Sequence, residues 1–201
     1  EIEFLLKILK KKSIFLLIDE AYAEFASHSV IKLLKKFNNL IISRTFSKGR
    51  GAAGCRVGYT IANKYIINRI QNIQLTYPIS NVSIKFALYL IKNMKEIDSY
   101  IKNTIISRDK IIKLLKSSNF DVVNSKTNSI DFHHKYSDNQ EVVKILNTSG
   151  VAFKAGGKIT GTPVKIEGDN RNTWIRLSLG PETYSQGFIK KIIQYGKKNF
   201  K

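Results

Sequence analysis

The chain has 201 residues and a mass of 22.9 kDa, and 43% of its side chains are hydrophobic, which excludes a disordered or collagen-like polymer. No apolar run approaches the about 18–20 residues that a membrane-spanning helix needs. Cys55 is the single cysteine, so neither an internal disulfide framework nor a cysteine-rich metal site is expected, and a reducing, cytoplasmic compartment is predicted.

The charge is strongly basic, with 34 Lys and Arg against 15 Asp and Glu, a formal net charge of +19. Such an excess can mark a nucleic-acid-binding protein. Here the basic residues are mostly lysines spread along the whole chain, without zinc-finger spacing, a heptad repeat or interleaved aromatics. We therefore favour a solvated basic surface over a nucleic-acid-binding one, and this charge also suits a negatively charged small substrate.

The first part of the chain alternates between helical and strand-like patterns. Residues 2–9 have helical spacing, and because the chain opens directly in this pattern at Glu1, without a methionine, we expect it to be part of a longer protein. Residues 14–18 form a continuous apolar run, typical of a strand covered on both faces in a parallel α/β sheet. Further elements expected here are a helix at 30–37, a strand at 40–42, a glycine-rich loop at 49–54 and a strand at 57–62.

The second part begins with a helical pattern from residue 66 to 115, broken at Tyr77-Pro78. Beyond residue 117, short strand-like and helical pieces alternate, which predicts a small α+β domain. Strands are expected at 120–123, 129–133, 151–153 and 174–179, helices at 139–147 and 182–198, and an exposed excursion at 155–173.

Side chains suited to catalysis follow the first two predicted strands. Asp19 ends the first strand, and Tyr22 comes three residues later. Lys48 follows the second strand, preceded by Thr45 and Ser47. Functional groups of α/β sheets gather in the crevice beyond the carboxyl ends of the strands, so we expect these side chains to share one edge.

Arg56 lies beyond the glycine-rich loop, at the start of the third strand, and reaches the same edge if that strand is antiparallel. A lysine amine can form a Schiff base with an aldehyde, and pyridoxal phosphate (PLP) is the electron-sink cofactor that uses one. Its ring nitrogen needs a carboxylate partner, and its phosphate needs hydroxyl donors and a guanidinium. The residue types therefore match what PLP demands.

Three segments carry a family resemblance. Residues 17–22 read LIDEAY, and residues 44–59 read RTFSKGRGAAGCRVGY, with the lysine and arginine eight positions apart (56 − 48 = 8). Together they resemble the fold-type I PLP-dependent aminotransferases of class I/II, and among these the histidinol-phosphate aminotransferase group. Residues 174–180, WIRLSLG, are similar to the C-terminal segment of that family. The resemblance covers essentially the whole chain but only the second half of a full-length member.

The resemblance implies a cofactor role for six residues. Lys48 would hold PLP and shuttle the proton between substrate and cofactor, while Asp19 would pair with the ring nitrogen and Tyr22 would hydrogen-bond the ring oxygen. The phosphate would be bound by Thr45, Ser47 and Arg56. For each residue a structural alternative stays open, such as Asp19 capping the following helix.

The resemblance also implies substrate contacts. Arg176 would bind the α-carboxylate; the alternative is that it is only a surface ion-pair partner. Lys154 stands where family members usually have a second arginine for the substrate phosphate, and because lysine lacks the guanidinium fork, the identity of the substrate is open.

The fold class implied is α/β, fold type I, in three parts. Residues 1–80 would be the C-terminal part of the large PLP-binding domain with its mostly parallel sheet, 81–117 a long connecting helix, and 118–201 the small α+β domain. The expected enzyme is a homodimeric aminotransferase of amino-acid biosynthesis, moving an amino group between an amino acid or amino-alcohol phosphate and a 2-oxo acid. The alternatives are a threonine-phosphate-type decarboxylase and a basic nucleic-acid-binding domain with a decayed motif.

Overall fold

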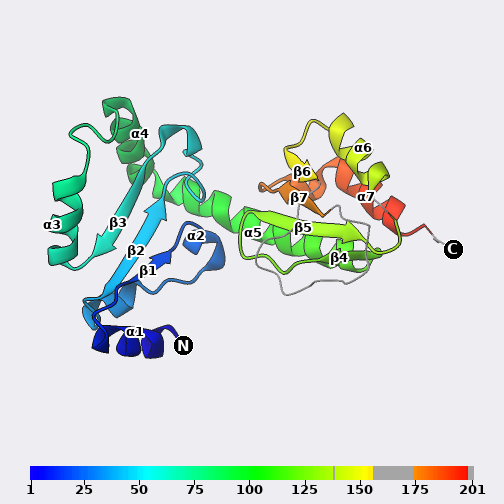
Figure 1. The fold of residues 1–201 in the computed structure, drawn as a ribbon. Coiled ribbons are helices and arrows are strands. Elements are labelled where there is room, and N and C mark those ends of the chain that lie inside the picture. Colours follow the sequence, from blue (N-terminus) through cyan, green and yellow to red (C-terminus); the bar gives the residue numbers. More distant parts are fainter. Residues whose placement is uncertain (138, 156–173, 199–201) are drawn as a thin grey trace. The chain divides into compact units, whose positions relative to one another are not determined.

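The computed structural model describes residues 1–137, 139–155 and 174–198 and divides into two compact units, Glu1–Asp98 and Ser99–Lys201 (Figure 1). Residues 156–173, which hold most of the excursion expected at 155–173, lie outside the described residues. Among the helices that the structure describes, none combines the length and apolarity needed to cross a membrane.

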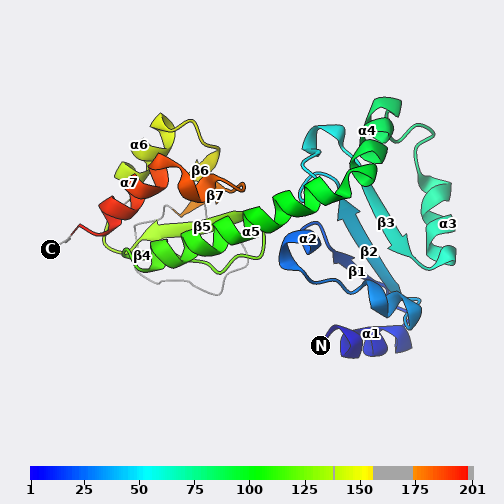
Figure 2. The same ribbon diagram turned by 180° about the vertical axis from the view of Figure 1, so that it is seen from behind.

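The sheet of the first unit has the order β1-β2-β3, built from Leu16–Asp19, Leu40–Thr45 and Gly58–Ala62 (Figures 1 and 2). β1 runs parallel to β2, with Asp19 opposite Ser43. β3 runs antiparallel to β2, with Gly58 opposite Thr45, which confirms the condition set for Arg56 above.

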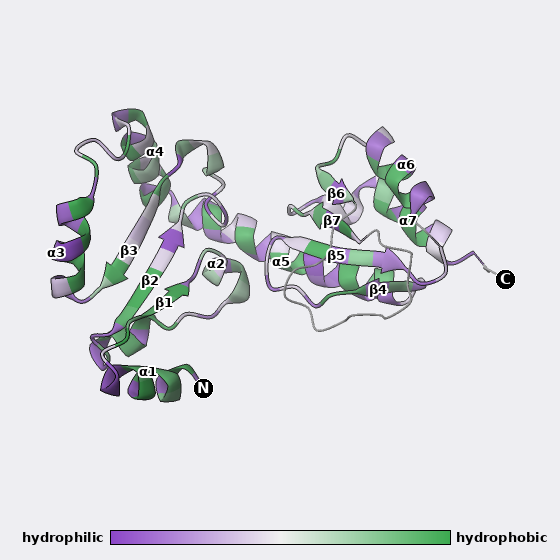
Figure 3. Cartoon of the chain, in the orientation of Figure 1, coloured by the Kyte–Doolittle hydropathy of each residue, from purple (hydrophilic) through white to green (hydrophobic). Residues whose placement is uncertain are grey.

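The core of this unit lies on one side of β1 and β2, where Leu6 of α1 packs with Leu40 and Ile42. Figure 3 shows the hydrophobic colouring of β1 and of the first part of β2, whose end is hydrophilic. The continuous apolar run predicted a strand covered on both faces, but Leu17 of β1 is 61% exposed, so within the described unit only one face is covered. The helical elements of this unit are α1 Ile2–Lys11, α2 Ala23–Ala26, α3 Lys64–Ile73, α4 Asn81–Lys92 and the 3₁₀ turns Ile31–Lys35 and Ala53–Cys55.

The connecting segment at 81–117 was expected to be one long helix, and this is wrong in detail. α4 ends at Lys92 and α5, Met94–Lys116, begins two residues later. Asn93 between them leaves helical geometry, with φ −109° and ψ 38°, and its side-chain Nδ2 donates to the carbonyl of Tyr89 at 2.8 Å. Asparagine side chains compete with the backbone for such acceptors, and Asn93 lies at the break between the two helices. The functional division at 1–80, 81–117 and 118–201 stays a prediction.

The second unit contains an antiparallel sheet in the order β4-β5-β7-β6, covered on one face by helices. Its strands are β4 Phe120–Val122, β5 Ser129–His134, β6 Phe153–Ala155 and β7 Ile175–Ser178. Its helices are most of α5, α6 Gln140–Thr148 and α7 Gly187–Gly196. The 3₁₀ turn Thr183–Ser185 lies in front of α7, so the helix expected at 182–198 is shorter. The core combines strand residues such as Ile130 and Leu177 with Ile111 of α5, Leu146 of α6 and Ile192 of α7.

Candidate active site

The carboxyl ends of β1 and β2 and the start of β3 lie at one edge of the first sheet. β1 ends at Asp19, which is level with Ser43 of the parallel neighbour, and β2 continues two residues further to Thr45. Thr45 is opposite Gly58, the first residue of β3. The segments that carry the predicted cofactor residues therefore leave or enter the sheet at this edge.

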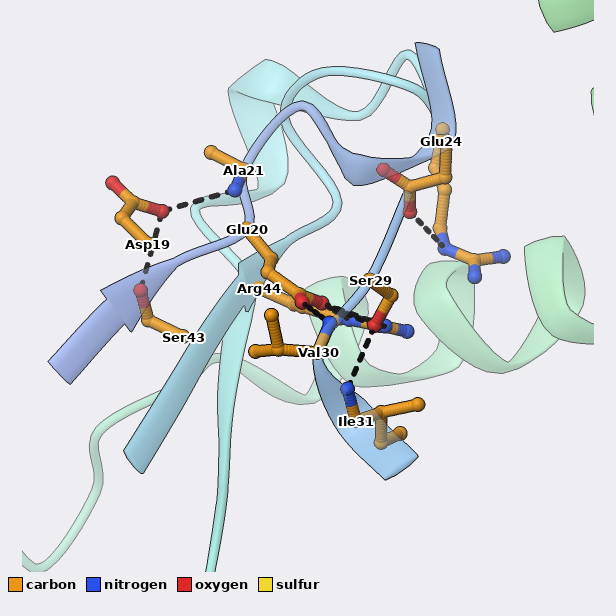
Figure 4. Close-up of polar contacts among 10 residues, drawn as sticks. Asp19, Glu20, Ala21, Glu24, Ser29, Val30, Ile31, Ser43 and Arg44 are labelled. Atoms are coloured by element: carbon orange, nitrogen blue, oxygen red, sulfur yellow. Dashed lines mark hydrogen bonds and ion pairs between the residues drawn. The ribbon is translucent and has the colours of Figure 1, made fainter. Parts of the chain in front are cut away.

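Asp19 is exposed at the end of β1, and its carboxylate is oriented by two hydrogen bonds (Figure 4). Its Oδ1 accepts from the backbone N–H of Ala21 at 3.0 Å and from the hydroxyl of Ser43 at 3.2 Å. Asp19 is not the N-cap of the following helix α2, because that position is taken by Tyr22. The tether to the neighbouring strand holds an exposed anion at the sheet edge.

Lys48 and Tyr22 come from separate segments and meet in space. The ammonium Nζ of Lys48 lies 5.2 Å from the centroid of the Tyr22 ring, within the range of a cation–π contact. Lys48 is exposed, so its amine is accessible to a reactant. The structure thus brings the predicted catalytic lysine next to one of the predicted cofactor ligands.

Thr45 and Ser47 shape the loop that carries Lys48. The Thr45 hydroxyl donates to the carbonyl of Val57 at 3.3 Å and accepts from the N–H of Ser47 at 3.0 Å. The N–H of Gly51 donates to the carbonyl of Lys48 at 3.1 Å, and Gly51 has φ +67°, a conformation that favours glycine. The hydroxyl of Thr45 is therefore used inside the loop, while the loop itself forms a tight turn around Lys48.

Arg56 ends the loop in the left-handed region, with φ 54°. Its side chain is exposed, and Nη1 donates to the carbonyl of Ala53 at 3.2 Å. A non-glycine residue in this conformation is uncommon and costs free energy. The uncommon conformation belongs to the backbone, and it carries an exposed guanidinium that suits an anion.

Arg50, to which the sequence assigned no role, anchors the same loop. Its guanidinium lies 5.2 Å from the Phe46 ring centroid and its Nε lies 3.8 Å from Oε1 of Glu24. A Cβ on Gly49 would approach the Cβ of Glu24 to 3.1 Å, so the loop and the segment after β1 pack closely.

Glu20 and Arg44 were not predicted as site residues, yet they join the two strand ends (Figure 4). Arg44 Nε and Nη2 donate to Oε2 of Glu20, and the N–H of Val30 donates to Oε1. Burial alone would raise the pKa of Glu20, but the hydrogen bonds from Val30, Arg44 and Ser29 outweigh it and leave that pKa below its ordinary value. An acid directly after an apolar strand, with an arginine at the end of the next strand, was the available sequence signal.

The two predicted substrate residues lie opposite each other in the second unit. Lys154 of β6 is the register partner of Arg176 of β7. Arg176 forms a bidentate ion pair with Asp131 of β5, from Nε to Oδ1 at 2.8 Å and from Nη2 to Oδ2 at 3.0 Å. The alternative interpretation of Arg176 as an ion-pair partner is therefore realised in this structure, and Asp131 was missed. An acid between the apolar residues Ile130 and Phe132 of a strand was the signal for an outward-facing charge.

The sequence model of the family described as "Aminotransferase class I and II" matches residues 1–192. The chain belongs to this family. Its edge of β1, β2 and β3 is accordingly the candidate active site of an aminotransferase-family chain.

Similar proteins agree on the family and the fold. The chain is 31% identical over 189 residues to a histidinol-phosphate aminotransferase of Brachyspira hyodysenteriae, covering 92% of this chain and 51% of that protein. Among solved structures it resembles the histidinol-phosphate aminotransferase of Sinorhizobium meliloti in complex with pyridoxal-5'-phosphate, with a TM-score of 0.72 and 22% identity over 96% of this chain and 53% of the other. It also resembles the L-threonine-O-3-phosphate decarboxylase of Porphyromonas gingivalis, with a TM-score of 0.66 and 21% identity over 96% of this chain and 59% of the other.

These likenesses establish the fold-type I architecture of PLP-dependent transferases expected from the sequence. The chain spans about half the length of the curated relatives that it matches, 51% in the Brachyspira protein.

Proposed function

We propose that this chain is part of a PLP-dependent aminotransferase that moves an amino group between an amino acid, or an amino-alcohol phosphate of the histidinol-phosphate type, and a 2-oxo acid. The observation that carries the proposal is the meeting of Lys48 and Tyr22 at the sheet edge where Asp19 also stands. The relative named histidinol-phosphate aminotransferase supports the substrate class. A cytoplasmic homodimer is part of the same proposal.

The residues present fit PLP by their chemistry. The edge offers an exposed amine on Lys48, an exposed carboxylate on Asp19 and an exposed guanidinium on Arg56, so each charged part of the cofactor has a counterpart. Gly51 and its turn let backbone N–H groups approach a phosphate without a side chain in the way. PLP, when bound, supplies a conjugated ring that accepts the electron pair released at the substrate's Cα.

The chain's own residues perform the remaining tasks. Lys48 holds the cofactor and, as a free amine, removes and returns the proton at the substrate's Cα. Asp19 keeps the ring nitrogen protonated, because a carboxylate beside it favours the charged form. Tyr22 donates its hydroxyl to the ring oxygen, and the phosphate is held by Thr45, Ser47 and Arg56. Holding the phosphate requires the Thr45 hydroxyl to turn from its present acceptor, the carbonyl of Val57.

Arg176 and Lys154 bind the acidic groups of the substrate in this proposal. Arg176 takes the carboxylate, for which its planar fork is suited. Lys154 takes the second anionic group, such as a phosphate, as a point charge. The two residues are register partners on β7 and β6. One substrate with two anionic groups, or each of two alternative substrates, can therefore contact both side chains.

A second candidate reaction is decarboxylation of a threonine-phosphate-like amino acid, and the likeness to the Porphyromonas gingivalis decarboxylase favours keeping it. Incubation of the full-length, PLP-loaded protein with histidinol phosphate and 2-oxoglutarate should yield glutamate. Release of CO₂ from threonine phosphate without glutamate formation would instead select the decarboxylase.

The cofactor assignment is tested by spectroscopy on the full-length protein. The parent loaded with PLP is expected to show a visible absorbance band, and borohydride reduction should attach the cofactor to Lys48. Lys48→Ala should lose both signals, while Lys32→Ala, which removes an exposed lysine from a 3₁₀ turn of the same unit, should keep them. Labelling of a different lysine would refute the assignment.

A further inference from the structure

Three charged residues form a row across neighbouring strands of the second sheet. Asp131 of β5 is the register partner of Arg176 of β7, and Arg176 is in turn the partner of Lys154 of β6. In β7 the neighbours Ile175 and Leu177 are buried in the helix-covered core, so Arg176 faces the other side of the sheet. The row therefore reads acid, guanidinium, amine on one face.

The pair between Asp131 and Arg176 has ideal geometry for a charge-assisted contact. Both carboxylate oxygens of Asp131 accept, at 2.8 Å from Nε and 3.0 Å from Nη2. The Asp131 side chain is 13% exposed while that of Arg176 is 54% exposed, so the acid is the better-held partner and the guanidinium is the accessible one. A fork of this kind is the same contact that a substrate carboxylate would make.

We propose that Asp131 is a specificity-determining residue that neutralises Arg176 and weakens the binding of substrates anchored by a carboxylate at that position. The inference rests on the proposed function, in which Arg176 binds the substrate carboxylate. The Asp131 carboxylate accepts hydrogen bonds from the guanidinium in the way that a substrate carboxylate would. Asp131 therefore acts through Arg176 without touching the reacting atoms.

The sign of the effect follows from electrostatics. A carboxylate that uses Nε and Nη2 must first displace Asp131, which loses two charge-assisted hydrogen bonds. A carboxylate that uses another edge of the same guanidinium shares one positive charge with a second anion nearby, and like charges repel. In both geometries Asp131 opposes the incoming carboxylate, and the net positive charge of the row lies at Lys154.

The substrate preference follows from this imbalance. The register partner of Lys154 on the neighbouring strand β7 is Arg176 and not an acid. An anionic group that binds to the Lys154 ammonium therefore does not compete with a carboxylate at that cross-strand position. Asp131 therefore disfavours anchoring at Arg176 relative to anchoring at Lys154. Removing its charge should shift the enzyme towards carboxylate-anchored substrates.

Calorimetric titration of the full-length, PLP-loaded protein with succinate, an unreactive dicarboxylate, tests the proposal. Asp131→Asn is expected to tighten succinate binding about twofold to fivefold, the range for a partly exposed ion pair. In steady-state assays the KM for a carboxylate substrate should fall with kcat little changed, and Asp131→Glu should restore weak binding. Glu141→Gln, which removes one acid from an exposed Glu141–Lys144 pair in the same unit, should leave succinate affinity unchanged.

A tighter complex is a readout that a purely structural role would not produce, because loss of structure weakens binding. Unchanged or weaker succinate binding in Asp131→Asn overturns the proposal. A lower succinate affinity would mean that Asp131 orients Arg176 for substrate binding. Asp131→Ser serves as the second variant if the asparagine protein unfolds.

Arg176→Ala separates this inference from the proposed function. If Arg176→Ala abolishes succinate binding while Asp131→Asn fails to tighten it, only the role of Asp131 falls. If Arg176→Ala leaves succinate binding intact, the substrate role of Arg176 falls as well, whereas the cofactor assignment stands on the Lys48 spectra.

Discussion

Glu20 and Arg44 form a part-buried ion pair in which two guanidinium nitrogens of Arg44 donate to one carboxylate oxygen of Glu20, Nε at 3.0 Å and Nη2 at 2.8 Å. Glu20 follows Asp19 directly, and Arg44 precedes Thr45. The pair therefore joins the ends of β1 and β2 beside the candidate cofactor site. The second carboxylate oxygen of Glu20 accepts from the backbone N–H of Val30 at 2.6 Å, so the segment after α2 is also attached to this pair.

Glu20→Gln should destabilise the protein because it leaves the half-buried guanidinium of Arg44 without its counter-charge. We expect urea unfolding to show a free energy lower by about 2–4 kcal/mol. Glu141→Gln, in an exposed pair, is the control and should stay within about 0.5 kcal/mol of the parent.

The same variant should also change the acid response. Because the pKa of Glu20 is lowered from its ordinary value of 4.5, its stabilisation is complete above that value and is lost as the pH falls through the lowered pKa. The glutamine protein lacks this contribution. An identical acid-unfolding profile in both proteins would contradict the pair's importance.

Arg56→Gly should separate stability from cofactor binding. The arginine has φ 54°, so glycine relieves strain, and the unfolding free energy should stay equal or rise by up to about 1 kcal/mol. PLP affinity, measured by absorbance titration of the full-length protein, should fall at least about tenfold with the loss of the guanidinium. Ser13→Gly, at φ 56° and far along the chain from the loop, should gain similar stability and bind PLP normally.

Gly196→Ala should destabilise the second unit by steric overlap. A Cβ on this residue of α7 would collide with the carbonyl of Ser118 and the ring of Phe120, neither of which is the end of a flexible chain. We expect a loss of about 2–4 kcal/mol in urea unfolding. Gly187→Ala, at the start of the same helix with nothing within 4 Å of the new Cβ, should be neutral or stabilising.

His134 should make the second unit sensitive to mild acid. Burial lowers its pKa below the ordinary 6.5, the neighbouring His133 adds to this, and a hydrogen bond with the Gly196 backbone only partly offsets it. Its Nδ1 accepts from the N–H of Tyr136 at 3.2 Å, a contact that requires the neutral ring.

The unfolded chain therefore takes up a proton at a higher pH than the folded one, and stability should be lost as the pH falls from 6.5 through the lowered pKa. The measurement is the thermal unfolding temperature between about pH 7.5 and about pH 5, the range in which histidine titrates. His134→Gln should flatten the profile, whereas His28→Gln, at an exposed position, should keep it. A parent profile that is flat over this range would refute the prediction.

Local patterns were sufficient for the strands β1 and β2 and for the family, but not for every helix boundary. Continuous apolar runs end in Asp19 and lead into Thr45, and these became β1 and β2 because a short apolar run bounded by polar residues is a local signal for a strand. The interval between Lys48 and Arg56 together with the acid at 19 carried the resemblance, which the family match across residues 1–192 confirms. The single helix expected at 81–117 was wrong, because the chain leaves helical geometry at Asn93, a local break that hydrophobic periodicity does not register.

By itself, the sequence determined the family and the order of the strands along the chain and supplied the candidate reactive side chains, because these depend on residue identity and on spacing within single segments. Only the tertiary structure decided that Glu20 pairs with Arg44 and that Asp131 pairs with Arg176, since the partners lie 24 and 45 positions apart in the sequence, respectively. Such partners are selected by strand register, and register depends on the packing of the whole sheet.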